Sequence, residues 1–156
     1  MRGYRFDENG NIVPIKVYIV WGPPASGKTT YVRKHMQPGD LVVDLDLIKQ
    51  AISMCGKTEA PDTLLPTALS IREHIYGLIE RREIDCQTVW VVAGLPRADE
   101  REALARRLGA ELIRIEATEQ ECLERAMADA ERTDKAKQRW VIERWFREFY
   151  AEAADE

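Results

Sequence analysis

Residues 22–29 read Gly22-Pro23-Pro24-Ala25-Ser26-Gly27-Lys28-Thr29 and fit the pattern G-x-x-x-x-G-K-[ST]. The apolar run of residues 17–21 predicts a buried strand that leads directly into this stretch. Residues 29–35 contain no glycine or proline and predict the beginning of a helix. Because the pattern also occurs by chance, the flanking strand and helix are what make it informative. The stretch therefore predicts an α/β fold in which a glycine-rich loop joins a strand to a helix.

The chemistry that such a loop predicts is phosphate binding. Gly22 and Gly27 tolerate backbone angles that residues with a Cβ resist, so consecutive N–H groups can turn inward. Those donors lie at the positive end of a helix dipole and form an anion site, the P-loop. We expect Lys28 to reach the β- and γ-phosphate oxygens, and the Thr29 hydroxyl to ligate Mg²⁺.

The cofactors predicted from the loop are ATP, or another nucleoside triphosphate, and Mg²⁺. The alternative is an ordinary glycine turn between strand and helix with an incidental lysine. The loop residues predicted to hold the nucleotide are Gly22, Pro23, Pro24, Ala25, Ser26, Gly27, Lys28, Thr29 and Thr30.

The composition predicts a soluble globular protein. The chain has 156 residues, 45% of them hydrophobic and 32% charged, and we expect one domain over residues 1–156. No stretch approaches the ~20 apolar residues of a membrane helix, so no membrane partner is expected. The N-terminus lacks the apolar core of a signal peptide. The net charge of −4 argues against extended duplex-DNA binding, but leaves room for a local basic groove.

The cysteines indicate a cytoplasmic protein. Cys55, Cys86 and Cys122 are isolated, odd in number and outside any metal-ligand spacing. We expect them to be reduced and mostly buried.

The remaining pattern alternates strands with helices. Further strands are expected at 41–44, 88–93 and 112–115, and helices at 47–52, 67–82, 99–108, from 118 towards 132, and at 136–153. Asp46 is placed at a helix N-cap, Pro66 in a loop and Gly109 after a helix end. This order predicts a three-layer α/β/α P-loop NTPase fold with a mainly parallel sheet of four or five strands. Residues 1–14 form either a hairpin around Asn9-Gly10 or a flexible arm.

The last predicted helix carries a stripe of large apolar side chains. We expect them to pack against the sheet, with a stacking surface for a base as the alternative. The residues of the stripe are Val141, Ile142, Trp145, Phe146, Phe149 and Tyr150.

Two carboxylates follow the second core strand. In open α/β sheets the ligand crevice lies beyond the carboxyl ends of the strands, so Asp44 and Asp46 are expected to face the P-loop. Asp46 is our candidate for the general base that deprotonates a hydroxyl during phosphoryl transfer. The alternative is that Asp46 only caps its helix. Asp44 is expected to act on the metal, through a Mg²⁺-bound water or through Thr29.

The P-loop followed by Asp46-Leu47-Ile48-Lys49-Gln50-Ala51-Ile52 resembles the kinase domain of bacteriophage-type polynucleotide 5′-kinases. The related zeta-toxin-like and other small P-loop kinases look similar. The resemblance implies that Asp46 is the general base and that Lys49, three residues later, holds an acceptor phosphate. The family usually has Arg at the second position, and Lys lacks the bidentate fork of Arg.

The resemblance extends along most of the chain. It implies a substrate loop at residues 93–97, although Ala93 stands where the family often carries an acidic residue. It also implies a closing helix at residues 141–146. The resemblance further implies that a lid helix follows the fourth core strand and supplies an arginine to the transferring phosphates.

Two arginines are candidates for the lid residue. Arg125 is favoured by placement as the catalytic one, and Arg132 is the second candidate for contacting the nucleotide. The alternative for either is a surface ion pair, such as Glu121 with Arg125. Arg97, beyond the third strand, is expected either to attract the acceptor or to be a solvated charge.

These residues predict an ATP-dependent kinase that transfers the γ-phosphate to a hydroxyl. The acceptor is either a nucleic-acid 5′-end or a nucleotide-like small molecule. One alternative is a P-loop ATPase coupled to a partner, such as a phage packaging or remodelling factor, but no acidic pair ends the third strand. Another is a nucleotide-binding module with little catalysis. The acceptor, the choice between ATP and GTP, and the oligomeric state are left open by the sequence.

Overall fold

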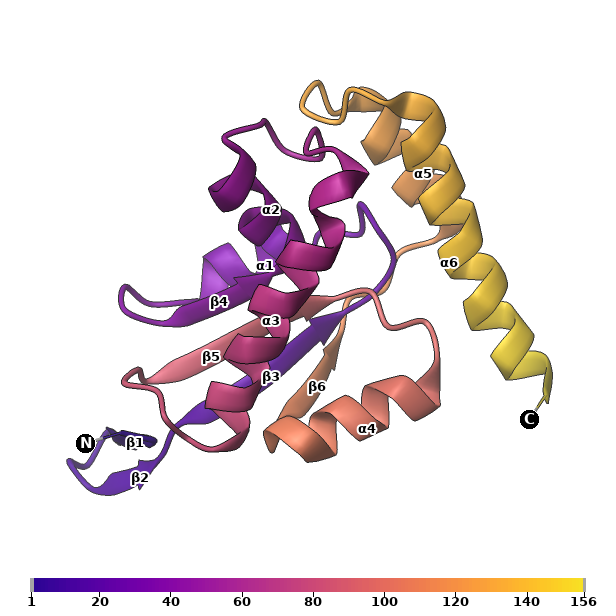
Figure 1. Cartoon of the computed structure of the whole chain (residues 1–156). Coiled ribbons are helices and arrows are strands. Elements are labelled where there is room, and N and C mark those ends of the chain that lie inside the picture. Colours follow the sequence, from indigo (N-terminus) through magenta and orange to yellow (C-terminus); the bar gives the residue numbers. More distant parts are fainter. Residues whose placement is uncertain (1, 156) are drawn as a thin grey trace.

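The computed structural model describes residues 2–155 and has helices on both faces of a sheet (Figure 1). The strands are β1 (Tyr4–Phe6), β2 (Ile12–Pro14), β3 (Lys16–Trp21), β4 (Leu41–Asp44), β5 (Thr88–Ala93) and β6 (Glu111–Arg114). The helices are α1 (Lys28–His35), α2 (Leu45–Ser53), α3 (Leu65–Glu80), α4 (Ala98–Leu108), α5 (Glu119–Ala128) and α6 (Lys135–Asp155). A 3₁₀ turn, η1 (Asp62–Leu64), precedes α3.

The central sheet has four parallel strands in the order β4-β5-β3-β6. The two inner strands β3 and β5 are the most apolar, and they pair over their whole length from Lys16 opposite Thr88 to Trp21 opposite Ala93. Parallel strands put their carboxyl ends at one edge, so the P-loop after β3 lies beside the ends of β4 and β5. The predicted α/β fold with a four-stranded sheet is confirmed.

Alternating side chains divide the core between the two faces of the sheet. Ile19 and Val91 pack with α3 and α4, which cross the front face in Figure 1. Val20 and Trp90 point the other way and pack against Val32 of α1. The period of two along each strand thus accounts for the three layers.

Helix α6 covers the carboxyl ends of β3 and β5 with its apolar stripe. Trp145 is buried, stacks on Trp21 at 6.5 Å between ring centroids, and donates its indole N–H to the carbonyl of Gly94 at 3.0 Å. Ile142 and Phe146 are also buried, so core packing is the correct interpretation of most of the stripe. Tyr150 is exposed.

Some predicted element boundaries were wrong. Helix α3 begins at Leu65, with Pro66 inside its first turn, where the missing N–H of proline costs no hydrogen bond. Helix α5 begins after Thr118 as expected, but it ends at Ala128, so Arg132 lies on the loop that follows. The fourth core strand is shifted by one residue, to Glu111–Arg114.

Two local features agree with the predictions, the N-terminal hairpin and the end of α4. Strands β1 and β2 form the antiparallel hairpin, with Tyr4 opposite Pro14. Gly109 ends α4 in the left-handed conformation. The cysteines are free; Cys122 is buried, whereas Cys55 and Cys86 are only half-buried. In residues 2–155, none of the helices has the length and apolar character needed to cross a membrane.

Candidate active site

The P-loop is built from residues that tolerate unusual backbone. A Cβ at Gly22 would lie 2.6 Å from the carbonyl oxygen of Ile115, so only glycine fits there. Gly27, the N-cap of α1, has a φ of 101° and provides no side-chain cap. The N–H groups of the first turn of α1 therefore have no capping side chain, and they point their partial positive charge towards an anion.

Lys28 lies folded against the loop that precedes it. Its Nζ donates to the carbonyl oxygens of Gly22 at 2.8 Å and Pro23 at 2.7 Å. Burial lowers the pKa of Lys28 to about 8, and the negative charge of Asp44 opposes this effect only in part. An anion beside Lys28 would favour the ammonium form, so phosphate binding and protonation of this lysine should be linked.

A cavity of about 420 Å³ adjoins the loop. It lies between the P-loop, the carboxyl ends of β4 and β5, helix α3, and α5 with the loop after it. Its lining residues are Pro24, Ala25, Ser26, Gly27, Lys28, Thr29, Thr30, Asp44, Leu45, Asp46, Lys57, Arg72, Val92, Ala93, Gly94, Arg125, Asp129 and Arg132. Most of the predicted nucleotide-binding loop thus shares one cavity with both aspartates and both candidate lid arginines.

The two aspartates have different local roles from those predicted. Asp44, not Asp46, is the N-cap of α2, and its Oδ1 accepts the N–H of Asp46 at 2.9 Å. The prediction of Asp46 as a cap was wrong because the helix begins at Leu45, two residues before the predicted Leu47. Burial, and then the charge of Asp46, raise the pKa of Asp44. Asp46 is exposed, and its carboxylate has no hydrogen bond or ion pair to any residue in the described part of the chain.

The two candidate lid arginines reach the cavity from different segments, Arg125 from α5 and Arg132 from the loop after it. Arg125 of α5 donates to the carbonyl oxygen of Ser26 at 2.8 Å and lies 3.9 Å from Glu121, so the expected surface pair is present beside a P-loop contact. Arg132 is more buried. It donates to Gln138 Oε1 at 2.7 Å and pairs with Asp129 at 3.3 Å. Arg125 is the more exposed and the less restrained of the two.

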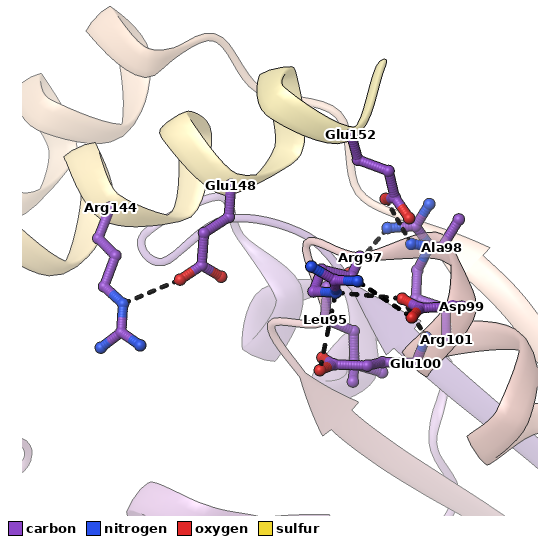
Figure 2. Close-up of polar contacts among 9 residues, drawn as sticks. All are labelled: Leu95, Arg97, Ala98, Asp99, Glu100, Arg101, Arg144, Glu148 and Glu152. Carbon is purple, nitrogen blue, oxygen red and sulfur yellow. Dashed lines mark hydrogen bonds and ion pairs between the residues drawn. The ribbon is translucent and has the colours of Figure 1, made fainter. Parts of the chain in front are cut away.

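Two predicted acceptor residues do not line the cavity. Arg97 pairs with Asp99 at 3.2 Å and lies 3.9 Å from Glu100, at the beginning of α4 (Figure 2). Lys49 is half-buried on α2; the hydrogen bond and charge of Lys137 lower the pKa of Asp62, and the charge of Lys49 adds a smaller effect in the same direction. The cavity lining therefore gives no support to either residue, and their roles stay predictions.

Two cationic residues of the cavity were missed by the sequence analysis. Arg72 comes from the middle of α3, where the apolar spacing indicated only a core helix. Lys57 comes from the loop between α2 and η1. No motif marks either residue. Only the packing of α3 and this loop beside the strand ends brings them to the site.

Polar contacts join the loop that contains Lys57 to the segment after α5. Lys57 lies 3.3 Å from Asp129 and 3.8 Å from Glu131. The hydroxyl of Thr133 donates to Glu59 at 3.4 Å, and Lys137 pairs with Asp62 at 3.0 Å. We call these four interactions the mouth contacts, because Lys57 and Asp129 also line the cavity.

The residues present fit a nucleoside triphosphate with Mg²⁺. The hydroxyl oxygen of Ser26 is buried without a hydrogen-bond partner among the described residues, on the loop where phosphate oxygens would lie. No cluster of three metal-ligating side chains occurs in the described part of the chain. Mg²⁺ is usually held by one or two protein oxygens together with phosphates. Thr29 and Asp44 both line the cavity with side-chain oxygens, as do Ser26, Thr30, Asp46 and Asp129.

Comparisons with known proteins agree with this geometry. A family model described as an AAA domain matches residues 17–151. Comparison with curated proteins gives no match. Among solved structures, the chain is similar to a chain of the Pnkp1/Rnl/Hen1 RNA repair complex, with a TM-score of 0.64 and 16% identity over 91% of this chain and 46% of that one. It thus spans less than half the length of that chain.

Two smaller proteins are also similar. Shikimate kinase from Acinetobacter baumannii in complex with shikimate has a TM-score of 0.53 and 17% identity, over 85% of this chain and 75% of that one. TT1252 from Thermus thermophilus has a TM-score of 0.51 and 16% identity, over 83% and 79%. At such identities the likeness establishes the fold. The expected resemblance to small P-loop kinases is confirmed at that level.

Proposed function

The chain belongs to the AAA domain family, and on that premise we propose that it is a kinase that transfers the γ-phosphate of ATP to a hydroxyl acceptor. One observation carries the proposal. The carboxylate of Asp46, which has no partner among the described residues, lines the same cavity as the P-loop and Lys28. Because Asp44 already caps α2, capping does not explain an aspartate at position 46.

The donor half of the proposed reaction uses the P-loop. The backbone N–H groups at the beginning of α1 bind the phosphates, and Lys28 leaves its two carbonyl partners to reach the β- and γ-phosphate oxygens. Thr29 and Asp44 would hold the Mg²⁺ that accompanies the nucleotide. When bound, Mg²⁺ neutralises charge that develops on the phosphate oxygens.

The acceptor half of the proposed reaction uses Asp46. Its carboxylate accepts the proton of the attacking hydroxyl as the new oxygen–phosphorus bond forms and the bond to the ADP oxygen breaks. Arg125 stabilises the negative charge on the transferring group, because it is the exposed arginine nearest the loop. Arg132 contacts the nucleotide from the opposite end of the lid segment.

The resemblance and the neighbouring folds support two classes of acceptor. A nucleic-acid 5′-hydroxyl fits the likeness to the RNA repair complex, and a small hydroxyl compound fits the likeness to shikimate kinase. The ATPase alternative has less support. The end of β5 contributes Val92, Ala93 and Gly94 to the cavity, none of which could activate a water.

The proposal is tested by incubating the protein with γ-labelled ATP and a panel of 5′-hydroxyl oligonucleotides, nucleosides, nucleotides and sugars. Label is expected on one acceptor class, at a rate well above γ-phosphate release without acceptor. Equal phosphate release with and without acceptors would favour the ATPase. Binding of ATP with neither transfer nor hydrolysis would leave only a nucleotide-binding module.

A further inference from the structure

The cationic side chains of the cavity differ in what they already bind. Lys28 donates to backbone carbonyls and Lys57 pairs with Asp129. Arg125 and Arg132 each have a hydrogen bond to a protein oxygen. Within the described residues that line the cavity, Arg72 is the one cation with neither a hydrogen bond nor an ion pair to a protein group. Its donor groups remain available for a ligand.

Arg72 is held in place by an aromatic ring. Its guanidinium carbon lies 5.5 Å from the ring centroid of Tyr76, one turn further along α3. Tyr76 is buried, and the guanidinium carbon of Arg107 lies 5.9 Å from the same ring. Arg107 is itself fixed by Glu73 and Glu80. A cation–π contact positions the guanidinium plane without occupying its N–H donors, which a salt bridge would occupy.

Lys49 offers a contrast on the neighbouring helix. The resemblance to polynucleotide kinases assigns it the acceptor phosphate, but it lies outside the cavity lining. Arg72 and Asp46 line the cavity together, from α3 and α2. Arginine also supplies the planar two-pronged donor that phosphate and carboxylate groups match and that lysine lacks.

We propose that Arg72, in place of Lys49, binds an anionic group of the acceptor. The acceptor is then a hydroxyl compound that carries a phosphate or carboxylate, with the anion on Arg72 and the reacting hydroxyl beside Asp46. The second half of this inference, the placement of the reacting hydroxyl beside Asp46, rests on the proposed kinase function. Its first half, an anion site at Arg72 separate from the P-loop, can be tested without any transfer reaction.

The first experiment measures inorganic phosphate binding by calorimetry to the full chain saturated with Mg²⁺ and a non-hydrolysable ATP analogue, which fills the P-loop. The wild-type complex is expected to bind one phosphate, and R72Q to bind it about tenfold more weakly or worse. R72K should fall between them, because it keeps the charge but loses the fork. K49Q and R106Q, a charge-matched change on α4, should bind like wild type. Acetate in place of phosphate distinguishes a carboxylate site.

Several outcomes would overturn the assignment. These are no phosphate binding by the wild-type complex, equal binding by R72Q, or a loss confined to K49Q. Thermal unfolding and ATP-analogue affinity of R72Q guard against a folding defect, and R72K supplies a second variant if R72Q is unstable.

The second experiment uses matched acceptors, each hydroxyl compound with and without a phosphate group. The wild type should prefer the phosphorylated member in kcat/KM, and R72Q should lose most of that preference through KM. A preference unchanged in R72Q would contradict the inference. If no acceptor is labelled at all, the kinase proposal fails, whereas the phosphate-binding result still decides the role of Arg72.

Discussion

The two walls of the cavity present different chemical groups: one mainly backbone N–H groups, the other side chains. The proposed donor wall, residues 22–30, offers backbone N–H groups and a single buried lysine, and its residues 24–30 line the cavity. The acceptor wall, made by Asp46 and Arg72, consists of side chains from α2 and α3. A backbone site depends on contiguous residues and their allowed angles, whereas a side-chain site depends on how distant elements pack. The walls should therefore respond separately to substitution.

The largest expected effect is on the acceptor wall. Asp46→Asn removes the proton acceptor but keeps the shape of the side chain, so kcat should fall about 10³-fold. The affinity for nucleotide should stay within about twofold, since the substituted amide leaves the donor wall intact. Transfer of γ-label and titration with a fluorescent ATP analogue measure the two quantities. Asp99→Asn, a change outside the cavity, is the control. Half or more of the wild-type kcat in D46N would remove Asp46 from the mechanism.

Substitutions of Arg125 and Arg132 should differ in their effect on the stability of the fold. Arg125→Gln is expected to lower kcat about 10²-fold with little change in melting temperature, because Arg125 is exposed. Arg132→Gln should also lower the melting temperature by a few degrees, since it leaves buried Gln138 without its partner. Single-turnover rates and thermal unfolding of both variants provide the comparison. The reverse pattern would make Arg132 the residue that acts on the transferring phosphate.

A smaller effect is expected on the donor wall. Gly22→Ala places a Cβ against the carbonyl of Ile115 and forces the loop to move, so nucleotide affinity should fall about 30-fold. Gly39→Ala is a matched control, because Gly39 also has a positive φ but has open space around it and lies outside the cavity. It should cost stability and leave nucleotide affinity unchanged. Equal affinity in the Gly22 and Gly39 variants would mean that the loop tolerates displacement.

The smallest expected effect is the pH dependence of the donor wall. With a pKa of about 8, Lys28 is mostly charged at pH 7 and mostly neutral at pH 9, whereas bound phosphates would keep it charged. Binding above pH 8 must then take up a proton, so the Kd for nucleotide should rise about tenfold from pH 7 to pH 9. Lys28→Met should bind weakly and show no such rise. A flat profile for the wild type would mean that Lys28 keeps its charge without ligand.

The sequence predicted the donor wall more completely than the acceptor wall. The strand over 88–93 and the P-loop context could be predicted because apolar runs and glycine spacing are local signals. Asp44 and Asp46 are two residues apart, and which of them caps α2 depends on where the chain leaves β4. Pro66 predicts a loop because proline usually interrupts a helix, but the first turn of α3 accepts it.

Arg72 shows more clearly which site residues a sequence pattern cannot predict. Nothing near it in the sequence distinguishes it from a solvated charge on a core helix. Its significance arises only when α3 crosses the sheet beside the end of β4 and leaves this guanidinium without a protein acceptor among the described residues. Residues 46 and 72 are far apart in the chain, and their meeting is a property of tertiary packing.

The mouth contacts have a consequence for kinetics. They connect residues 57–62 with residues 129–137, and most of the side chains involved are substantially exposed to solvent. Exposed pairs of this kind are individually weak and are screened by salt. We expect salt to loosen these contacts beside the cavity, so the residence time of a bound substrate should shorten as ionic strength rises.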